Sequence, residues 1–115
     1  MTDVVKVFKA LSDGTRLRIL HILLERDCCV CEVMQVLGIS QPSASRHLSI
    51  LHEAGLLKSR KESIWMNYAI DWDTAPPYAQ EAIRAVVEAL KDDPEAKNDR
   101  KKLKKTVRQN MVCIN

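Results

Sequence analysis

The stretch SQPSASRHLSILHEAGLL, which covers Ser40–Leu57, decides the fold class of this chain. Ser40 is a typical N-cap, and Pro42 falls in the first helical turn, where a missing N–H costs no hydrogen bond. The helix is expected to end at Gly55, because glycine readily adopts the backbone conformation that terminates helices. At about 100° per residue, one side of this helix carries Ala44, Leu48 and Leu51. The opposite side is small, polar and basic.

A shorter helix is predicted immediately before this one. Apolar residues recur at helical spacing from about Cys31 to Leu37, and Gly38 suits a helix C-terminus. The members of this stripe are Val30, Val33, Met34 and Leu37. Two short helices joined by a glycine-containing turn, the second with a polar outer face, are typical of a helix-turn-helix.

After Gly55 the apolar pattern changes from a helical to an alternating period. The alternating positions, which predict a strand, are Ile64, Met66, Tyr68 and Ile70. Leu56 to Arg60 is expected to pair with this strand through a turn near Lys61–Ser63. A hairpin that follows a helix-turn-helix is a wing, and this wing carries Lys58, Arg60 and Lys61 at its tip.

The flanking segments are also helical by pattern. The first of them carries Val4, Val5, Phe8 and Leu11, and a second helix is predicted to end near Arg26. The last long helix carries Ala79, Ile83, Val86 and Leu90 on one face. We expect the first and last stripes to pair Val4, Val5 and Phe8 with Ile83, Val86 and Leu90 in a dimer, because helix-turn-helix proteins usually read two half-sites with two copies. The expected fold is mostly α with a β-hairpin wing, a dimeric winged helix-turn-helix.

Charge is unevenly distributed along the chain. Residues 97–115 contain seven basic residues and one acidic residue, a net charge of +6, whereas the whole chain carries +3 and the remainder therefore −3. Such a run usually forms a solvated face or a frayed end. We therefore expect one DNA-binding and dimerisation domain over residues 1–92, followed by a basic tail over residues 93–115.

Composition excludes several classes of protein. The 115 residues are 46% hydrophobic and 4% aromatic, which suits one domain with an aliphatic core. The first residues include an acid and no apolar segment, which argues against a signal peptide, and no apolar run approaches the roughly 18 residues of a membrane span. A cytoplasmic protein with reduced thiols and no membrane partner is expected. The sequence has no glycine-rich phosphate loop and no Cys/His/Asn pattern that would indicate an enzyme.

Three of the four cysteines, Cys28, Cys29 and Cys31, fall within four residues. A disulfide between such close neighbours closes almost no loop and has poor geometry. In a regular helix, residues two apart point about 200° away from each other, so Cys29 and Cys31 would share one ion only if the helix start were extended or distorted. Cys28 and Cys31 would be neighbours on an intact helix. Soft thiolates select soft ions, so the cluster predicts a site for a thiophilic ion.

Four stretches make the chain resemble the ArsR/SmtB family of metal-responsive winged-helix repressors. They are KALSDGTRLRIL (Lys9–Leu20), CVCEV (Cys29–Val33), SQPSASRHLSILHEAGLL (Ser40–Leu57) and WMNYAI (Trp65–Ile70). Together they cover residues 5–71 in order. The resemblance implies a homodimer that binds double-stranded operator DNA when ligand-free and releases it on binding an inducer.

The Cys-x-Cys formed by Cys29 and Cys31 is similar to the arsenite and antimonite site of the arsenical-resistance repressors. That site has a third cysteine, and here Met34 stands in its place. The resemblance therefore implies trivalent arsenic or antimony as inducer, no catalytic cofactor, and a third ligand from Cys28, Cys113 or a non-protein group. We expect Cys28, since it is adjacent, whereas ordering a tail to bring in Cys113 costs conformational entropy.

Other interpretations of the same residues stay open at this point. The thiols also suit cadmium or another soft metal, a redox or persulfide sensor, or a DNA-binding module that has lost its ligand. The zinc branches of the family place Asp and His ligands on the last helix. That pattern is missing here, since the histidines of the chain are His21, His47 and His52.

The DNA-contacting residues are expected on the outer face of the second helix of the helix-turn-helix and on the wing. Small hydroxyl side chains allow close approach to base edges, and Arg46 suits a bidentate contact to guanine. The residues expected in the major groove are Gln41, Ser43, Ser45, Arg46 and Ser49. The wing residues expected at the DNA backbone or minor groove are Arg60 and Lys61.

Overall fold

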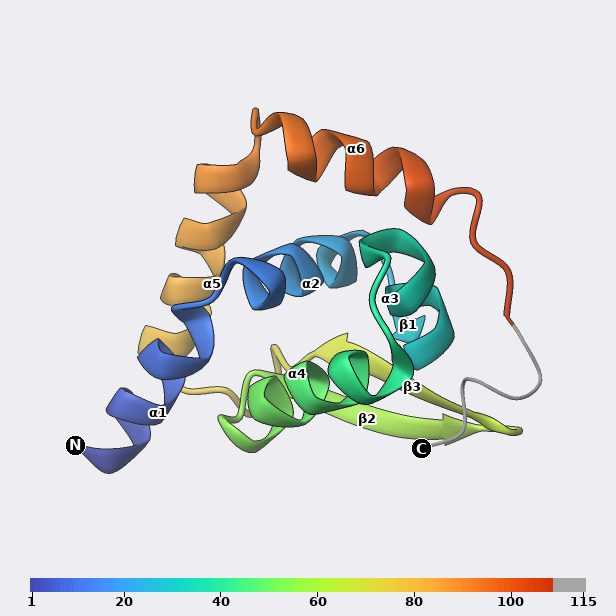
Figure 1. Ribbon diagram of the computed structural model, residues 1–115. Helices are drawn as coiled ribbons and strands as arrows, with labels where there is room; N and C mark the ends of the chain where they lie inside the picture. Colours follow the sequence, from blue (N-terminus) through green and yellow to red (C-terminus); the bar gives the residue numbers. More distant parts are fainter. Residues whose placement is uncertain (109–115) are drawn as a thin grey trace.

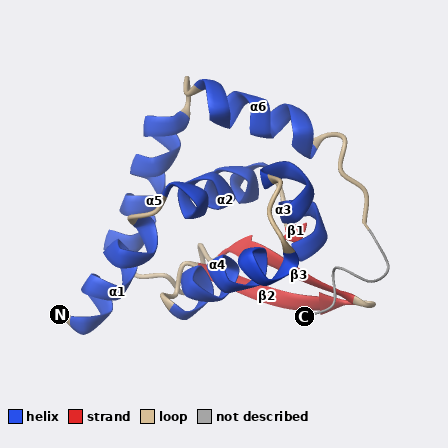
Figure 2. Ribbon diagram, viewed as in Figure 1, coloured by secondary structure: helices blue, strands red, loops and turns tan. Residues whose placement is uncertain are grey.

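The computed structural model describes residues 1–108, which form six helices and three strands (Figure 1, Figure 2). The helices are α1 (Thr2–Leu11), α2 (Gly14–Glu25), α3 (Val30–Leu37), α4 (Gln41–Glu53), α5 (Pro77–Leu90) and α6 (Pro94–Leu103). The strands are β1 (Cys28–Cys29), β2 (Leu57–Glu62) and β3 (Trp65–Ile70). Within the described residues, no helix is long and apolar enough to cross a membrane.

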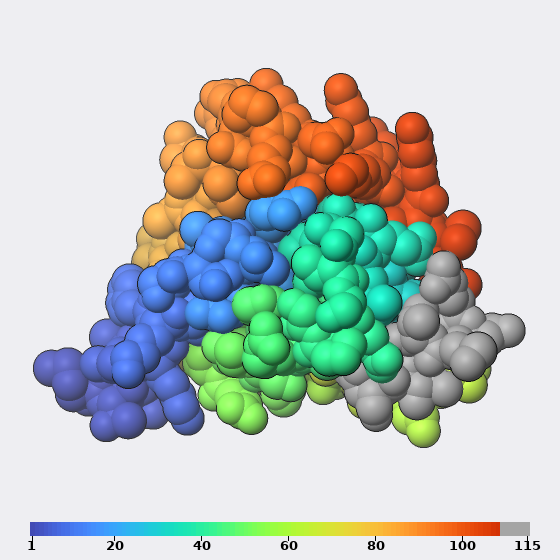
Figure 3. Space-filling model, in the orientation of Figure 1, coloured from blue at the N-terminus to red at the C-terminus, as the bar shows by residue number. Residues whose placement is uncertain are grey.

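Helices α3 and α4 form the predicted helix-turn-helix. Gly38, at φ 68° and ψ 36°, ends α3 in the left-handed conformation, and the Ser40 hydroxyl accepts a hydrogen bond from the Ser43 N–H at 3.3 Å at the start of α4. The buried residues of α4 are Ala44, Leu48 and Leu51, as their spacing predicts. They pack in one aliphatic core with residues of α2 and α3, among them Ile19, Leu20, Ile22, Val33 and Val36. The other face of α4 lies at the molecular surface, as the green region of Figure 3 shows.

Strands β2 and β3 form the predicted wing. They are the antiparallel hairpin of a sheet with the order β1-β3-β2. The closing pair is Glu62 and Trp65, so the turn consists of Ser63 and Ile64, one residue later than expected. Ser63 adopts φ 58°, the positive φ that tight two-residue hairpin turns require.

Strand β1 was not expected from the periodicity of the sequence. It is only two residues long, and it pairs antiparallel with β3 through Cys28 opposite Tyr68 and Cys29 opposite Asn67. A two-residue strand has no alternation to detect, and its pairing is set by residues about 40 positions away. The effect is to fix the cysteines at the inner edge of the wing.

Helix α6 corrects the expectation that the chain continues after residue 92 as a basic tail. Pro94–Leu103 is helical, packs against α2 and α3, and buries Ala96, Asp99 and Leu103 (Figure 1). Asp99 is fully buried and accepts hydrogen bonds from Nε and Nη2 of Arg18 on α2, each at 2.9 Å. The basic residues occupy the outer side of this helix. The remaining expected tail, residues 109–115, lies outside the described residues.

The residues expected at a dimer interface divide between surface and core. Val4, Val5 and Phe8 of α1 are exposed by 37%, 43% and 54%, which is typical of an apolar face that awaits a partner. Ile83 of α5 is fully buried within its own chain, so its expected place in the interface is wrong. Val86 and Leu90 are partly exposed and stay candidates for contact with a second copy.

Candidate thiol site and nucleic-acid interface

Cys29 and Cys31 lie on either side of the point where α3 begins. Cys29 is the N-cap residue, with an extended backbone at φ −86° and ψ 169°, and the helix starts at Val30. Cys31 therefore sits in the first helical turn. The Sγ atoms of Cys29 and Cys31 are 2.7 Å apart, and both residues are fully buried. The structure brings together the sulfurs of two of the three expected cysteines.

This geometry corrects the expectation that an ion must distort the start of α3 to reach both sulfurs. The expected divergence applies only when both residues are helical. Cys29 is extended and is held in register with Asn67 of β3, so its side chain turns toward Cys31 without any unwinding. The two sulfurs therefore converge at the start of α3 without a change in the helix.

Cys28 lies apart from this pair. Successive side chains of a strand point to opposite faces, and Cys28 precedes Cys29 in β1. Cys28 packs in the main aliphatic core, whereas Cys29 and Cys31 form a separate buried cluster with Trp65. The expectation that Cys28 and Cys31 neighbour each other on a helix is therefore wrong. Cys113, the other cysteine considered as third ligand, lies outside the described residues.

Burial keeps the thiols of β1 protonated at neutral pH. It raises the pKa of Cys28 to about 12 and that of Cys29 to about 11. The negative charge of Glu32 raises the pKa of Cys28 further. A helix N-terminus ordinarily lowers a thiol pKa, and here burial outweighs that effect. Because the thiolate is the nucleophile, such thiols react slowly with oxidants and electrophiles that need a free thiolate.

Glu32 holds the start of α3 in place. Its Oε1 accepts the backbone N–H of Cys29 at 2.9 Å, and its Oε2 accepts Nη1 of Arg26 at 2.8 Å. Burial disfavours the charged carboxylate, but these two hydrogen bonds outweigh burial and hold the pKa of Glu32 below its usual value. Glu32 is thus the charged residue that fixes the backbone of Cys29.

Trp65 and Arg108 cover the thiol pair from the side of the wing. Trp65, the first residue of β3, packs against the two cysteines. The guanidinium carbon of Arg108 lies 5.2 Å from the centre of a Trp65 ring, which is within the range of a cation–π contact. The end of the described chain therefore reaches the candidate ion site.

The expected DNA-contacting residues of α4 share its solvent-facing side. Gln41, Ser45 and Ser49 line a shallow open hollow together with Tyr68 of β3. Arg46 is exposed on the next position around the helix. Ser43 is partly buried and contributes its N–H to the cap at Ser40. A polar helix face with a projecting arginine suits the major groove.

Of the basic residues expected at the wing tip, Arg60 and Lys61 lie toward the tip, whereas Lys58 lies near the base of the hairpin, so its expected place is wrong. Arg60 and Lys61 are both exposed, and Arg60 Nη2 forms an ion pair with Glu62 Oε2 at 3.2 Å. Lys58 is paired with Asp73 at 2.8 Å. A phosphate contact by Arg60 therefore competes with an exposed ion pair, which is a weak interaction.

The three histidines and Met34 contact residues outside the candidate thiol site. Nε2 of His21 lies 2.5 Å from Nη1 of Arg100, and Nδ1 of His47 lies 3.1 Å from Nη1 of Arg16. His52 is near Ser59, and Met34 packs against the main core. Among residues 1–108, no group of three or more Cys, His, Asp or Glu side chains is placed to hold a metal ion.

Three residues of the site escaped the sequence analysis: Glu32, Trp65 and Arg108. Glu32 stands three residues after the N-cap, and that spacing is a known signal for a capping contact. Trp65 and Arg108 approach the cysteines only through the hairpin and through the path of the chain after α6. No local sequence pattern predicts that either residue lies near the cysteines.

Comparison with known proteins agrees with this arrangement. The model of the family described as bacterial regulatory protein, arsR family, matches residues 13–59. The arsenical resistance operon repressor of Escherichia coli K12 is 39% identical over 97 residues, which cover 75% of this chain and 83% of that protein. The cadmium resistance transcriptional regulatory protein CadC homolog of Staphylococcus aureus is 47% identical over 70 residues, 60% of this chain and 58% of that protein. The chain thus aligns with little more than half of the cadmium-resistance relative.

A solved structure shows the same architecture. The homodimeric winged helix-turn-helix DNA-binding domain of Mb0332 from Mycobacterium bovis, a possible ArsR-family transcriptional regulator, superposes with a TM-score of 0.64 at 29% identity. The superposition covers 81% of this chain and 82% of that one. With the helix-turn-helix, the wing and the long match to the Escherichia coli repressor, this chain belongs to the arsR family of bacterial regulatory proteins and has the winged helix-turn-helix fold.

Proposed function

We propose that this protein is a homodimeric transcriptional repressor that binds operator DNA through α4 and the wing and releases it when trivalent arsenic or antimony binds Cys29 and Cys31. The observation that carries the proposal is the convergence of two buried sulfurs at the start of α3, with the Sγ atoms 2.7 Å apart. The apolar face of α1 supports the dimer, as does the homodimeric relative from Mycobacterium bovis.

The raised pKa of Cys29 favours a metalloid hydroxide over a bare cation. As(OH)3 is neutral at pH 7, and each hydroxide it gives up leaves with a thiol proton as water, so the product is neutral. A divalent cation must instead release protons from thiols, and Cys29 has its pKa raised to about 11. A neutral product also suits a fully buried site, because burying net charge is costly.

Two contacts connect the thiol pair to the DNA-binding surface. Cys31 is part of α3, which packs directly on α4, and Cys29 is paired with Asn67 in the middle of the wing strand β3. An ion that bonds to both sulfurs links the start of α3 to β3. DNA release requires that the ion bind more tightly to the arrangement that does not fit DNA.

Release from DNA tests this proposal. A duplex selected from random sequences by the reduced protein is labelled, and its anisotropy is followed during titration with arsenite, antimonite, cadmium or peroxide. We expect arsenite and antimonite to release the duplex with an affinity that changes little between pH 6 and 8. Cadmium should gain about tenfold per pH unit for each proton it displaces.

Three outcomes of these titrations would count against the proposal. Release by cadmium at concentrations far below those of arsenite at pH 7 identifies a cation sensor instead. Release by peroxide alone, reversed by a reductant, identifies a redox sensor. A duplex that stays bound in every titration shows that these thiols do not control DNA binding.

Arg46→Ala tests the DNA-contacting face. A bidentate contact between arginine and guanine is worth about 1–3 kcal/mol, so the variant should bind the selected duplex more weakly and discriminate less at one base pair. Lys61→Ala should instead weaken binding to all duplexes and lower the slope of log affinity against log salt by about one unit. Lys91→Ala, at the far end of α5, is the control. Unchanged affinity and sequence preference in Arg46→Ala would place the interface elsewhere.

A further inference from the structure

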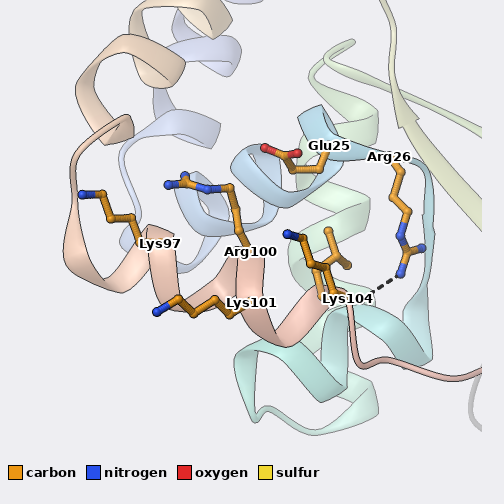
Figure 4. A pocket seen from close by; sticks show the side chains of 7 residues that line it. Glu25, Arg26, Lys97, Arg100, Lys101 and Lys104 are labelled. Atoms are coloured by element: carbon orange, nitrogen blue, oxygen red, sulfur yellow. Dashed lines mark hydrogen bonds between the residues drawn. The ribbon is translucent and has the colours of Figure 1, made fainter.

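We propose that the hollow between the end of α2 and the basic face of α6 binds a small ligand that carries several linked phosphate groups. This inference goes beyond DNA binding and the ion site, and it rests on neither of them. The hollow has a volume of about 630 Å³, and Figure 4 shows its polar side chains around one opening. The acid that lines it is Glu25, and the basic residues that line it are Arg26, Lys97, Arg100, Lys101 and Lys104.

Helical spacing concentrates the positive charge on one face of α6. Lys97, Arg100, Lys101 and Lys104 stand at positions i, i+3, i+4 and i+7, which are neighbours on a helix surface. The helix dipole stabilises cations in the last turn, but Lys97 lies in the first half of α6, where it gains no such stabilisation. Like charges at this spacing also repel one another and disfavour the helix. A bound anion removes that repulsion.

The three lysines of the hollow are available to a ligand. Lys97, Lys101 and Lys104 are exposed, and none of them belongs to an ion pair among residues 1–108. Arg26, by contrast, is committed to Glu32, whose Oε2 accepts from its Nη1 at 2.8 Å. A lysine ammonium on a flexible stem suits phosphate as a mobile point charge. We therefore assign the direct contacts with the ligand to the three lysines.

Arg100 is held at the hollow by His21 of α2. Nη1 of Arg100 lies 2.5 Å from Nε2 of His21. A guanidinium can only donate, so Nε2 is the acceptor and the neutral ring carries its proton on Nδ1. Burial, followed by the positive charge of Arg100, lowers the pKa of His21. A negative charge brought beside Arg100 would raise that pKa, which makes His21 a reporter for the hollow.

The lining and the span of the hollow indicate the class of ligand. Pockets of this size for drug-like molecules are lined mostly by apolar side chains, whereas here Leu103 is the apolar residue of the lining. The Cα atoms of Lys97 and Lys104 are about 10 Å apart along the helix axis, at 1.5 Å per residue. A single small anion cannot engage all three lysines over that span, but a short chain of phosphate groups places several charges along it.

The position of the hollow argues against the DNA backbone as its occupant. Helix α6 packs on α2 and α3, on the side away from α4 (Figure 1). A duplex bound to α4 therefore lies on the other side of the core. Glu25, at the end of α2, also interrupts the positive surface, so the region that attracts phosphate is short. A compact ligand fits such a region better than a long polyanion.

Calorimetric titration with tripolyphosphate, at low ionic strength where screening is weak, tests the site. The hollow variant, Lys101→Gln with Lys104→Gln, removes two lysines that line the hollow. The control variant, Lys102→Gln with Lys105→Gln, removes two exposed lysines of the same segment that do not line it. Both variants have the same net charge. We expect one tripolyphosphate per chain, with affinity about tenfold or more lower in the hollow variant and within about twofold in the control variant.

A proton NMR titration of the histidine rings locates the ligand. The charged groups that act on the His21 ring are Arg100, Glu25, Asp99 and Asp93. Tripolyphosphate should raise the pKa of His21 in the parent and in the control variant, but not in the hollow variant. His52, which lies near Ser59 of the wing, should keep its pKa and serves as the internal reference.

Four results would overturn the inference. Equal losses of affinity in the two variants would show a general attraction to the charged segment and no site. Inorganic phosphate that binds as tightly as tripolyphosphate would exclude a ligand of linked phosphates. Tripolyphosphate that binds without raising the pKa of His21 occupies another place. If tripolyphosphate does not bind, and the hollow variant alone lowers the salt dependence of binding to a random duplex, the occupant is nucleic acid.

Discussion

Arg18→Ala should lower the free energy of unfolding by about 3–5 kcal/mol, the range measured when one partner of a buried ion pair is removed. Asp99 has no exposed side-chain area and accepts two hydrogen bonds from Arg18, each at 2.9 Å. Without the guanidinium, α6 must either keep an uncompensated carboxylate in the core or separate from α2. Urea unfolding followed by circular dichroism at a fixed protein concentration measures the change.

Arg84→Ala is the matched control for this stability change. Arg84 pairs with Glu81 at 2.9 Å, but their side chains are 56% and 75% exposed, and such surface pairs contribute about 0–1 kcal/mol. A loss in Arg18→Ala no larger than the loss in Arg84→Ala would show that α6 is held by its apolar contacts alone. A reduced m-value in Arg18→Ala alone would show that α6 detaches before the core unfolds.

The helix-turn-helix and the wing were predictable because local signals agree with the tertiary structure. Ser40 caps α4, Gly38 ends α3 in a left-handed conformation, and Leu48 and Leu51 are buried where a helical period places them. The alternation that predicts β3 also holds for Tyr68 and Ile70, which are buried. At these positions the local preference of each residue and its packing in the folded chain favour the same conformation.

Helix α6 escaped prediction because its buried side is not apolar. It buries a small residue, a carboxylate and one leucine, Ala96, Asp99 and Leu103, and it surrounds them with basic residues. Periodicity of hydrophobic residues cannot detect a helix whose central buried group is Asp99. The missing information is the position of Arg18 on α2, 81 residues earlier, which compensates that charge.

The arrangement of the cysteines could be predicted only in part. Sequence spacing identifies Cys29 and Cys31, but it cannot show that Cys29 is an N-cap, since that depends on the two-residue pairing of β1 with β3. The same pairing places Cys28 in the main core, apart from the other two cysteines. Trp65 and Arg108 join the site through tertiary contacts with no local signature.

Cys29→Ser and Cys31→Ser should each bind operator DNA as tightly as the parent but no longer release it with arsenite. In the parent, a typical coupling free energy of about 1–3 kcal/mol weakens the DNA complex roughly 5- to 150-fold. Each variant keeps one sulfur of the buried pair, and one sulfur cannot link the start of α3 to β3. Serine is close in size to cysteine, so the fold and α4 should be retained. Fluorescence anisotropy of a labelled operator duplex, with and without saturating arsenite, measures the effect.

Cys28→Ala separates a role in the ion site from a role in packing. Cys28 is fully buried in the main core, and alanine avoids placing an unpaired hydroxyl there. We expect this variant to be somewhat less stable and to release DNA at the same arsenite concentration as the parent. If Cys28→Ala needs much more arsenite, Cys28 is a ligand of the ion. If Cys29→Ser and Cys31→Ser both still release DNA, the inducer binds elsewhere, because the 2.7 Å pair is the only convergence of sulfurs within residues 1–108.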